Sequence, residues 1–279
     1  MRVLKAAACL LLLAPSGARA ATPALSAASA AAIQKEWHDS LLRLRPELAD
    51  LIEATEVRLV PPDEYARLTS RPDVEGTYDW DNHRVYVNRD VVAGILADAA
   101  AKSPDADQAA AWLSLHIVDH ELAGHADAVR RLEAAAGRYS GMVLEEELTA
   151  FSVEAEGIVR SYRDPVIRRG LSGVAGLASL RHKEILATIP RGVEGFERLL
   201  RARRYTLPTV SAKAKEYRDY AAVIERAQRM MGRTPAEIGD DPAIKRAREN
   251  ADSLEKFYGA ERGRLATMLA RLKIEPLTP

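Results

Sequence analysis

The segment from His116 to Ala128, HIVDHELAGHADA, holds three of the six histidines of the chain within ten residues. Glu121 follows His120 directly, and His125 comes five residues after His120. Two neutral imidazoles and one anionic oxygen are a common ligand set for zinc, with a fourth position left open for water. A carboxylate beside that water can take its proton. The segment therefore indicates a metal site that activates water, with Glu121 as the proton acceptor.

The spacing of the two histidines does not fit a regular helix. At about 100° per residue, His125 would point about 140° away from His120. One inserted residue, accommodated as a π-bulge, returns the fifth position to the face of the first, and such bulges are frequent at functional sites. Gly124 stands directly before His125, and glycine leaves room for a displaced turn. We therefore predict a π-bulge near Gly124.

A second helix, expected at about 142–162, carries the adjacent carboxylates Glu145, Glu146 and Glu147. Relative to the apolar stripe of that helix, Glu147 lies about 60° away, Glu145 about 100° and Glu146 about 160°. A ligand must face the neighbouring helix at the edge of the core, so we predict Glu147 as the third ligand. Glu154, one heptad later on the same side, is expected to accept a hydrogen bond from a ligand histidine.

Residues 120–125, HELAGH, resemble the H-E-x-x-G-H motif of the dipeptidyl-peptidase III family of zinc metallopeptidases. In that family a Glu-Glu-x-x-Ala-x segment on a later helix supplies the third ligand, and residues 146–151, EELTAF, are similar to it. The chain is much shorter than members of that family, and Phe151 stands where the family has an acidic residue. The short gap between the motifs looks more like the compact Glu-ligand zincins, so no aminopeptidase specificity is carried over.

The resemblance implies a zinc-dependent metallopeptidase that hydrolyses a peptide or protein substrate. Zn²⁺ would be held by His120, His125 and Glu147, and Glu121 would be the catalytic base. The alternative is a non-catalytic zincin-like scaffold or binding protein with a degenerate or structural metal site. The inserted residue in the HExxxH motif favours this alternative, whereas Glu121 argues against it, because a structural zinc needs no base.

Two further details stay open at the level of sequence. His116 and His120 are four residues apart and share a helix face, and HIVDH resembles an inverted zinc motif in which Asp119 replaces the usual glutamate. A zinc peptidase also needs a donor that stabilises the oxyanion of the tetrahedral intermediate. The candidates for that donor are Tyr162, Tyr205 and His182.

The composition excludes some classes of function and suggests export. The chain of 279 residues has 40 basic and 40 acidic residues, so it has no charge excess of the kind that favours binding to nucleic acid. Residues 1–20 combine a basic start, an apolar run and Ala18-Arg19-Ala20, which is typical of a cleavable signal peptide. We therefore expect a secreted or periplasmic protein whose mature chain has no membrane span. It would also lack cysteine, because Cys9 is the only one.

The hydrophobic patterns predict an α+β, mostly helical fold. We expect a zincin-like core over 21–165, with a small antiparallel sheet and two active-site helices, and a helical C-terminal region over 166–279 packed on it. The first residues, 21–32, are expected to form a loose leader. The elements expected after it are a helix at 33–52, a short strand before Pro61, a hairpin of 74–80 and 84–88, helices at 104–136 and 142–162, and amphipathic helices near 192–203, 212–231 and 241–272.

Overall fold

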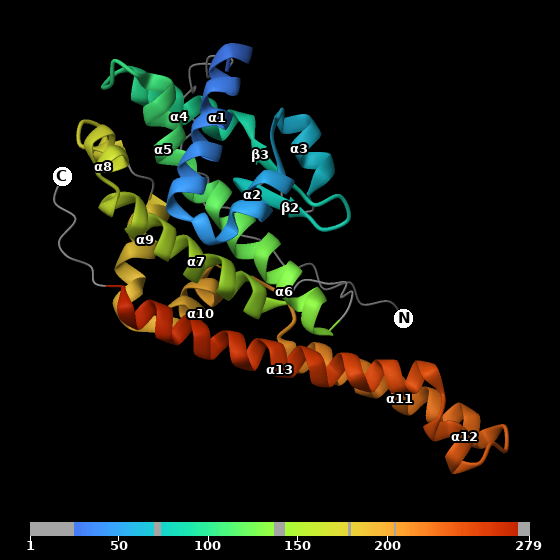
Figure 1. Ribbon diagram of the computed structural model, residues 1–279. Coiled ribbons are helices and arrows are strands. Elements are labelled where there is room, and N and C mark those ends of the chain that lie inside the picture. Colours follow the sequence, from blue (N-terminus) through green and yellow to red (C-terminus); the bar gives the residue numbers. More distant parts are fainter. Residues whose placement is uncertain (1–24, 70–73, 137–142, 178–179, 204, 273–279) are drawn as a thin grey trace, which may run out of the picture.

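The computed structural model describes residues 25–69, 74–136, 143–177, 180–203 and 205–272. Helices form most of the molecule, and one small sheet lies beside α1 and α3 (Figure 1). The expected signal peptide at 1–20, with Cys9, lies outside the described residues. The helices are α1 (Ala27–Leu44), α2 (Ala49–Ala54), α3 (Pro62–Leu68), α4 (Arg89–Ala100), α5 (Ala106–Asp119), η2 (His120–Ala126), α6 (Asp127–Ala136), α7 (Leu144–Arg163), α8 (Pro165–Leu171), α9 (Leu180–Thr188), α10 (Gly192–Ala202), α11 (Val210–Met230), α12 (Pro235–Gly239) and α13 (Pro242–Arg271), with short 3₁₀ segments η1 (Pro46–Leu48), η3 (Ala175–Leu177) and η4 (Ile189–Arg191).

The sheet has three strands in the order β1 (Glu56–Val60), β3 (Arg84–Asn88), β2 (Gly76–Asp79). The expected hairpin is present, since β2 pairs antiparallel with β3. The expectation of a purely antiparallel sheet is wrong, because β1 runs parallel to β3 and the sheet is mixed. Pro62 starts α3 directly after β1, so that this helix lies in the connection between β1 and the hairpin. The connection is long enough to let β3 lie between β1 and β2.

Several boundaries differ from the sequence expectations. The chain already becomes helical at Ala27, capped by the Ser26 hydroxyl, inside the stretch expected to be a loose leader. The helix expected at 33–52 is broken at Pro46, where a 3₁₀ turn leads into α2. The long central helix, expected from 104, begins at Ala106 and is capped by Asp105. Helices α3 and α4 were not anticipated, because each is short and follows a strand without a separating loop.

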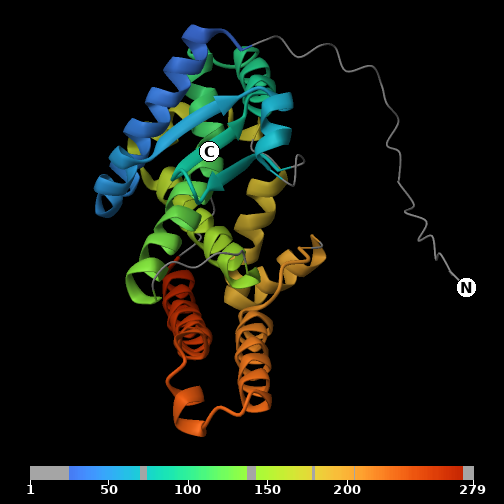
Figure 2. The same cartoon turned by 90° about the vertical axis from the view of Figure 1, so that its right-hand side faces the viewer.

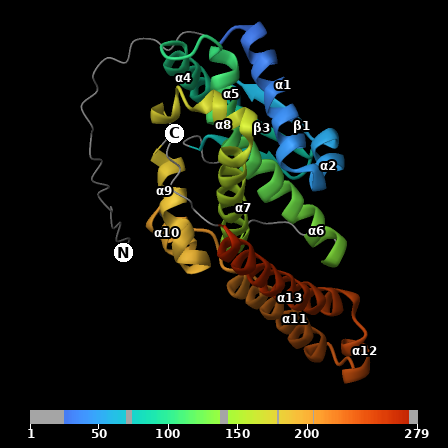
Figure 3. The same cartoon turned by 60° about the vertical axis from the view of Figure 1, so that its left-hand side comes forward.

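Helix α5 is the centre of the fold, and η2 and α6 continue it without interruption. Every residue of 109–119 is buried, between α1 on one side and α4 on the other. Figure 3 shows α7 crossing next to this continuous helix, and η2 makes most of the contact with α7. The helix that carries the histidines and the helix that carries the glutamates are therefore packed directly against each other.

A buried arginine joins three helices beside this crossing. Arg45, at the end of α1, donates to both carboxylate oxygens of Asp119, at 2.9 and 2.8 Å, and to the carbonyl oxygen of Val153, at 2.8 Å. The same guanidinium pairs with Glu156. A buried charge is tolerated when it is paired and hydrogen-bonded. This ion-pair cluster fixes the end of α5, and hence the start of η2, against α7.

The C-terminal helices form two groups. Helices α9, α10 and the end of α13 pack on α7 and share an apolar cluster with it, which includes Phe151, Phe196 and Leu265. Helices α11 and α13 run side by side as a long hairpin that extends away from the rest of the molecule, with α12 near its tip (Figure 2). Among the described residues, no helix has both the length and the apolar character needed to cross a bilayer.

Candidate metal centre

The residues His120–Ala126 form a π-helical segment between α5 and α6. The predicted π-bulge at Gly124 is thus confirmed. The distortion brings the two imidazole rings together, with centroids 5.0 Å apart and planes at 70°. Gly124 meets α7 closely, since a Cβ there would lie 2.6 Å from the Cα of Ala150. The missing side chain lets the wide π-turn sit against α7.

Each histidine is oriented by a buried carboxylate. The Nδ1 atom of His120 lies 2.8 Å from Glu154 Oε2, and the Nδ1 atom of His125 lies 2.9 Å from Glu146 Oε1. Because an ionised carboxylate only accepts hydrogen bonds, each Nδ1 atom can donate to its carboxylate, which leaves the two Nε2 atoms on the side of Glu147. Carboxylate partners of this kind are usual for metal-binding histidines. The expected role of Glu154 is therefore present in the geometry.

Glu147 faces both histidines. Its Oε2 lies 3.8 Å from His120 Nε2, and its Oε1 lies 3.9 Å from His125 Nε2. The structure thus places Glu147 where the helix phase put the third ligand, while Glu145 accepts a hydrogen bond from the backbone of Val210. Glu146 does not lie where the helix phase alone would put it, on the side away from the apolar stripe. Its side chain is fully buried and turned toward His125, because η2 covers that part of α7.

The Glu121 carboxylate closes the group on the side of β2. One carboxylate oxygen and one ring nitrogen from each of His120 and His125 all lie within 4.8 Å of one another. A Cβ at Gly76, the first residue of β2, would be 3.2 Å from Glu121 Oε1. Burial raises the pKa of Glu121, as does the charge of Glu147, although the nearby histidines oppose the shift. A carboxylate with a raised pKa can act as a general base and then as a general acid.

The charges around the histidines favour a cation. Burial lowers the pKa of His125, but the hydrogen bond to Glu146 and the charges of Glu147 and Glu121 outweigh it and raise the pKa to about 10. Glu147 Oε2 is buried and has no hydrogen-bond partner among the described residues. An unsatisfied buried carboxylate oxygen is costly unless a cation meets it. The buried group of His120, Glu121 and His125 could therefore hold a metal ion.

A small cavity of about 90 Å³ lies over this group. Tyr205, one of the three oxyanion candidates, lines it. The other two do not, because Tyr162 and His182 pack against each other with ring centroids 5.5 Å apart. The residues around the cavity are Thr69, Val74, Gly76, Thr77, Tyr78, Trp80, His120, Glu121, His125, Glu147, Arg181 and Tyr205.

Arg181 is a part of the centre that the sequence alone does not reveal. Its guanidinium donates to both oxygens of Glu154, at 3.1 and 2.7 Å, and to Glu75 at 3.2 Å. It also lies 4.8 Å from the ring centroid of Phe151, which itself packs edge-on against His120 at 4.9 Å. No motif marks Arg181, since it directly follows a Gly/Ala-rich stretch that reads as a linker.

The inverted motif is not assembled in the structure. Asp119 is held by Arg45, away from the cavity. The Nδ1 atom of His116 donates to the carbonyl oxygen of Leu113 at 3.0 Å, and its Nε2 lies 3.9 Å from Glu75 Oε2. Neither Asp119 nor His116 lines the cavity. His116 is therefore a packed histidine one turn before the centre.

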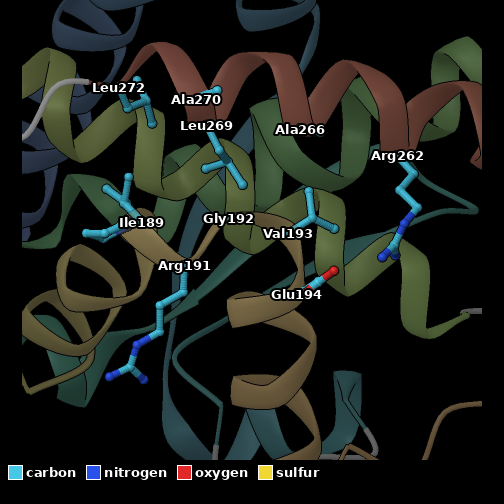
Figure 4. A pocket seen from close by; sticks show the side chains of 11 residues that line it. Ile189, Arg191, Gly192, Val193, Glu194, Arg262, Ala266, Leu269, Ala270 and Leu272 are labelled. Carbon is cyan, nitrogen blue, oxygen red and sulfur yellow. The ribbon is translucent and has the colours of Figure 1, made fainter.

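A larger hollow of about 720 Å³ lies elsewhere, between the start of α10 and the end of α13 (Figure 4). Its lining is mainly aliphatic, with Ile189, Val193 and Leu269 on its walls. The ionisable residues around it are Arg191, Glu194 and Arg262, and it contains no histidine. The chemically equipped site is thus the smaller cavity beside η2.

In comparisons with known proteins, the chain matches no family model, no curated protein and no solved structure. The resemblance to zinc-peptidase motifs is confined to residues 120–125 and 146–151. What the centre does must therefore be inferred from its own geometry and residue chemistry.

Proposed function

We propose that the protein is a zinc-dependent metallopeptidase that hydrolyses peptide bonds. One observation carries the proposal: the π-turn places His120, Glu121 and His125 together, with Glu147 facing both histidines. Two imidazoles, a carboxylate ligand and a separate carboxylate base form the residue set of a catalytic zinc site. A basic and apolar stretch at 1–20 supports export of the enzyme.

His120, His125 and Glu147 would hold the ion through two Nε2 atoms and a carboxylate. A bound zinc ion would act as a Lewis acid and would lower the pKa of a water molecule in the cavity. Glu121 takes the proton of the attacking water and later gives it to the leaving amine. Glu146 and Glu154 keep the two imidazole rings in place through their Nδ1 atoms.

The edge strand β2 would guide the substrate. It forms one edge of the sheet, and Gly76, Thr77 and Tyr78 line the cavity next to Glu121. An extended peptide can add to such an edge through main-chain hydrogen bonds. This arrangement would bring a scissile carbonyl toward Glu121. Tyr205, which lines the same cavity, is the candidate for stabilising the oxyanion.

A second candidate is a non-catalytic metal-binding protein. One observation favours it, namely the small volume of the cavity, about 90 Å³, above residues that are only 3–6% exposed. A bound metal would then serve stability. Glu121 separates the two candidates, because only the enzyme uses its proton transfer.

The test measures zinc content and hydrolysis in the wild type and three variants. Glu121→Gln keeps the size of the side chain but cannot take a proton, so zinc content and folding should persist while hydrolysis of an unfolded protein falls about 10²–10⁴-fold. His120→Ala should lose both zinc and activity. The matched control is Glu249→Gln, which makes the same change from carboxylate to amide at an exposed position on α13. Its zinc content and activity should equal those of the wild type.

Stoichiometric zinc with no cleavage of a broad peptide library, in wild type and Glu121→Gln alike, would establish the second candidate. A wild type that binds no zinc would exclude both candidates.

A further inference from the structure

The hairpin of α11 and α13 buries only one face of α11. Ala221 and Ile224 face α13, where they pack against Ile244 and Ala247. At about 100° per residue, Val223 points about 100° away from Ile224. It therefore lies on a different face of α11, beside the one that packs on α13.

This different face carries an exposed apolar line, called here the outer seam, formed by Tyr220, Val223, Ala227 and Met230. The exposed fractions of Tyr220, Val223 and Met230 are 57%, 60% and 85%. Four of the six large exposed apolar side chains in the described part of the chain are Tyr220, Val223, Met230 and its neighbour Met231. The spacing of three, four and three residues is that of a coiled-coil seam, which indicates a helix as the partner.

A groove runs beside the outer seam, between α11 and α13. It measures about 680 Å³, and Tyr217, Tyr220, Ala243 and Ala247 are among the residues that line it. Large side chains from a facing helix could enter it. Two helices with such a groove become half of a four-helix bundle when a second pair covers them.

The charges next to the outer seam identify the second pair as another copy of the same chain. Asp219 and Arg226 are seven residues apart, so they lie on the same flank of the seam. When two α11 helices pair antiparallel about a point between Ala222 and Val223, each Asp219 faces Arg226 of the second copy. Parallel pairing would instead set Asp219 against Asp219.

Both charged groups are available for this contact. Arg226 is exposed and makes no hydrogen bond or ion pair within the described residues. Asp219 has an exposed partner on its own helix, Lys215, and exposed pairs at this spacing contribute little. We infer that α11 is a self-association helix, and that the outer seams of two copies pair antiparallel so that the two hairpins form a four-helix bundle.

The test is the mass of the full chain in solution, measured by sedimentation equilibrium over a range of concentrations. The wild type should form dimers. Val223→Glu places a charge in the seam and should weaken the dimer roughly tenfold or more. Ala66→Glu, which introduces the same charge at an exposed position on α3, is the matched control and should leave the dimer unchanged.

A charge exchange tests the antiparallel pairing. Arg226→Asp should weaken the dimer about tenfold, because it sets two carboxylates against each other at both ends of the seam. Adding Asp219→Arg to it should restore the wild-type dissociation constant. Arg229→Asp makes the same charge change away from the seam and should have no effect.

Three results would overturn the inference. The first is a wild type that stays monomeric at every concentration. The second is a dimer that Val223→Glu does not weaken, or one that the charge exchange fails to restore. The third is a monomer that sediments with phosphatidylcholine vesicles through the seam, which would assign this face to a lipid surface. Circular dichroism of each variant checks that the exposed substitutions leave the fold intact.

Discussion

The contact between Gly124 and Ala150 should control both stability and metal binding. Gly124→Ala adds one methyl group, which would lie 2.6 Å from the Cα and 2.8 Å from the Cβ of Ala150. Ordinary contact begins at 3.4 Å, so α7 must move away from η2 by about 0.8 Å. The atoms met include backbone, and they cannot move aside by a change of rotamer.

The displacement has two consequences of different size. Overpacking of this kind costs about 1–3 kcal/mol, and the better helix propensity of alanine returns about 1 kcal/mol. With a backbone atom in the contact, we expect a net loss of about 2 kcal/mol in the free energy of unfolding. Glu147 lies one turn before Ala150 and moves with it. Metal sites tolerate errors of about 0.2 Å in ligand distance, so zinc affinity should fall about 10–100-fold, as for loss of an orienting partner.

Urea denaturation of the metal-free chain and zinc titration against a competing chelator measure the two effects separately. Gly94→Ala on α4 is the matched control, because a Cβ there meets nothing within 4 Å. It should stabilise the chain by about 0.5–1 kcal/mol and leave zinc affinity unchanged. If Gly124→Ala is as stable as Gly94→Ala and binds zinc like the wild type, close packing at the π-turn does not position the ligands.

Three further predictions concern individual side chains. Glu147→Gln should weaken zinc binding more than Glu146→Gln does in the same chelator competition, because the first loses an anionic ligand and the second only an orienting partner; equal losses would refute this assignment. Glu154→Gln should lower zinc affinity about 10–100-fold in that assay, and an unchanged affinity would show that His120 is held by packing alone. Burial lowers the pKa of His116 to about 4 and that of His182 to about 3. The unfolded state therefore binds more protons below pH 6.5, and each histidine should lower the free energy of unfolding by about 2 kcal/mol at pH 5. His182→Phe should make the free energy of unfolding, measured by urea denaturation, depend less steeply on pH. An unchanged dependence on pH would contradict the reasoning.

Helix periodicity was enough to predict the main parts of the centre. The misfit between His120 and His125 predicted a π-turn, because only an extra residue in the turn brings a fifth position back to the same face. The phase of α7 likewise separated Glu147 from Glu145. Both inferences depend on neighbours within one helix, where the geometry is nearly fixed by the backbone.

Features that depend on contacts between distant segments could not be predicted from the sequence. The role of Arg181 requires α9 to lie beside α7, and the Arg45 cluster requires the end of α1 to meet α5. The placement of β1 beside β3 depends on where α3 takes the chain. Glu146 was placed wrongly by phase alone, since the burial of its side chain comes from η2 rather than from α7 itself.

The π-turn also determines how the helix tolerates changes in length. In a regular helix, one added or removed residue rotates everything beyond it by about 100°. Here the seven residues of His120–Ala126 absorb the extra position, and α5 and α6 keep regular turns on either side. If one residue were removed from this segment, the segment could form an ordinary α-helix, and the two histidines would then be four positions apart. Helix α6 would keep its present face toward its neighbours. The segment is therefore a place where insertion and deletion can interconvert two forms of one motif without refolding the helix around it.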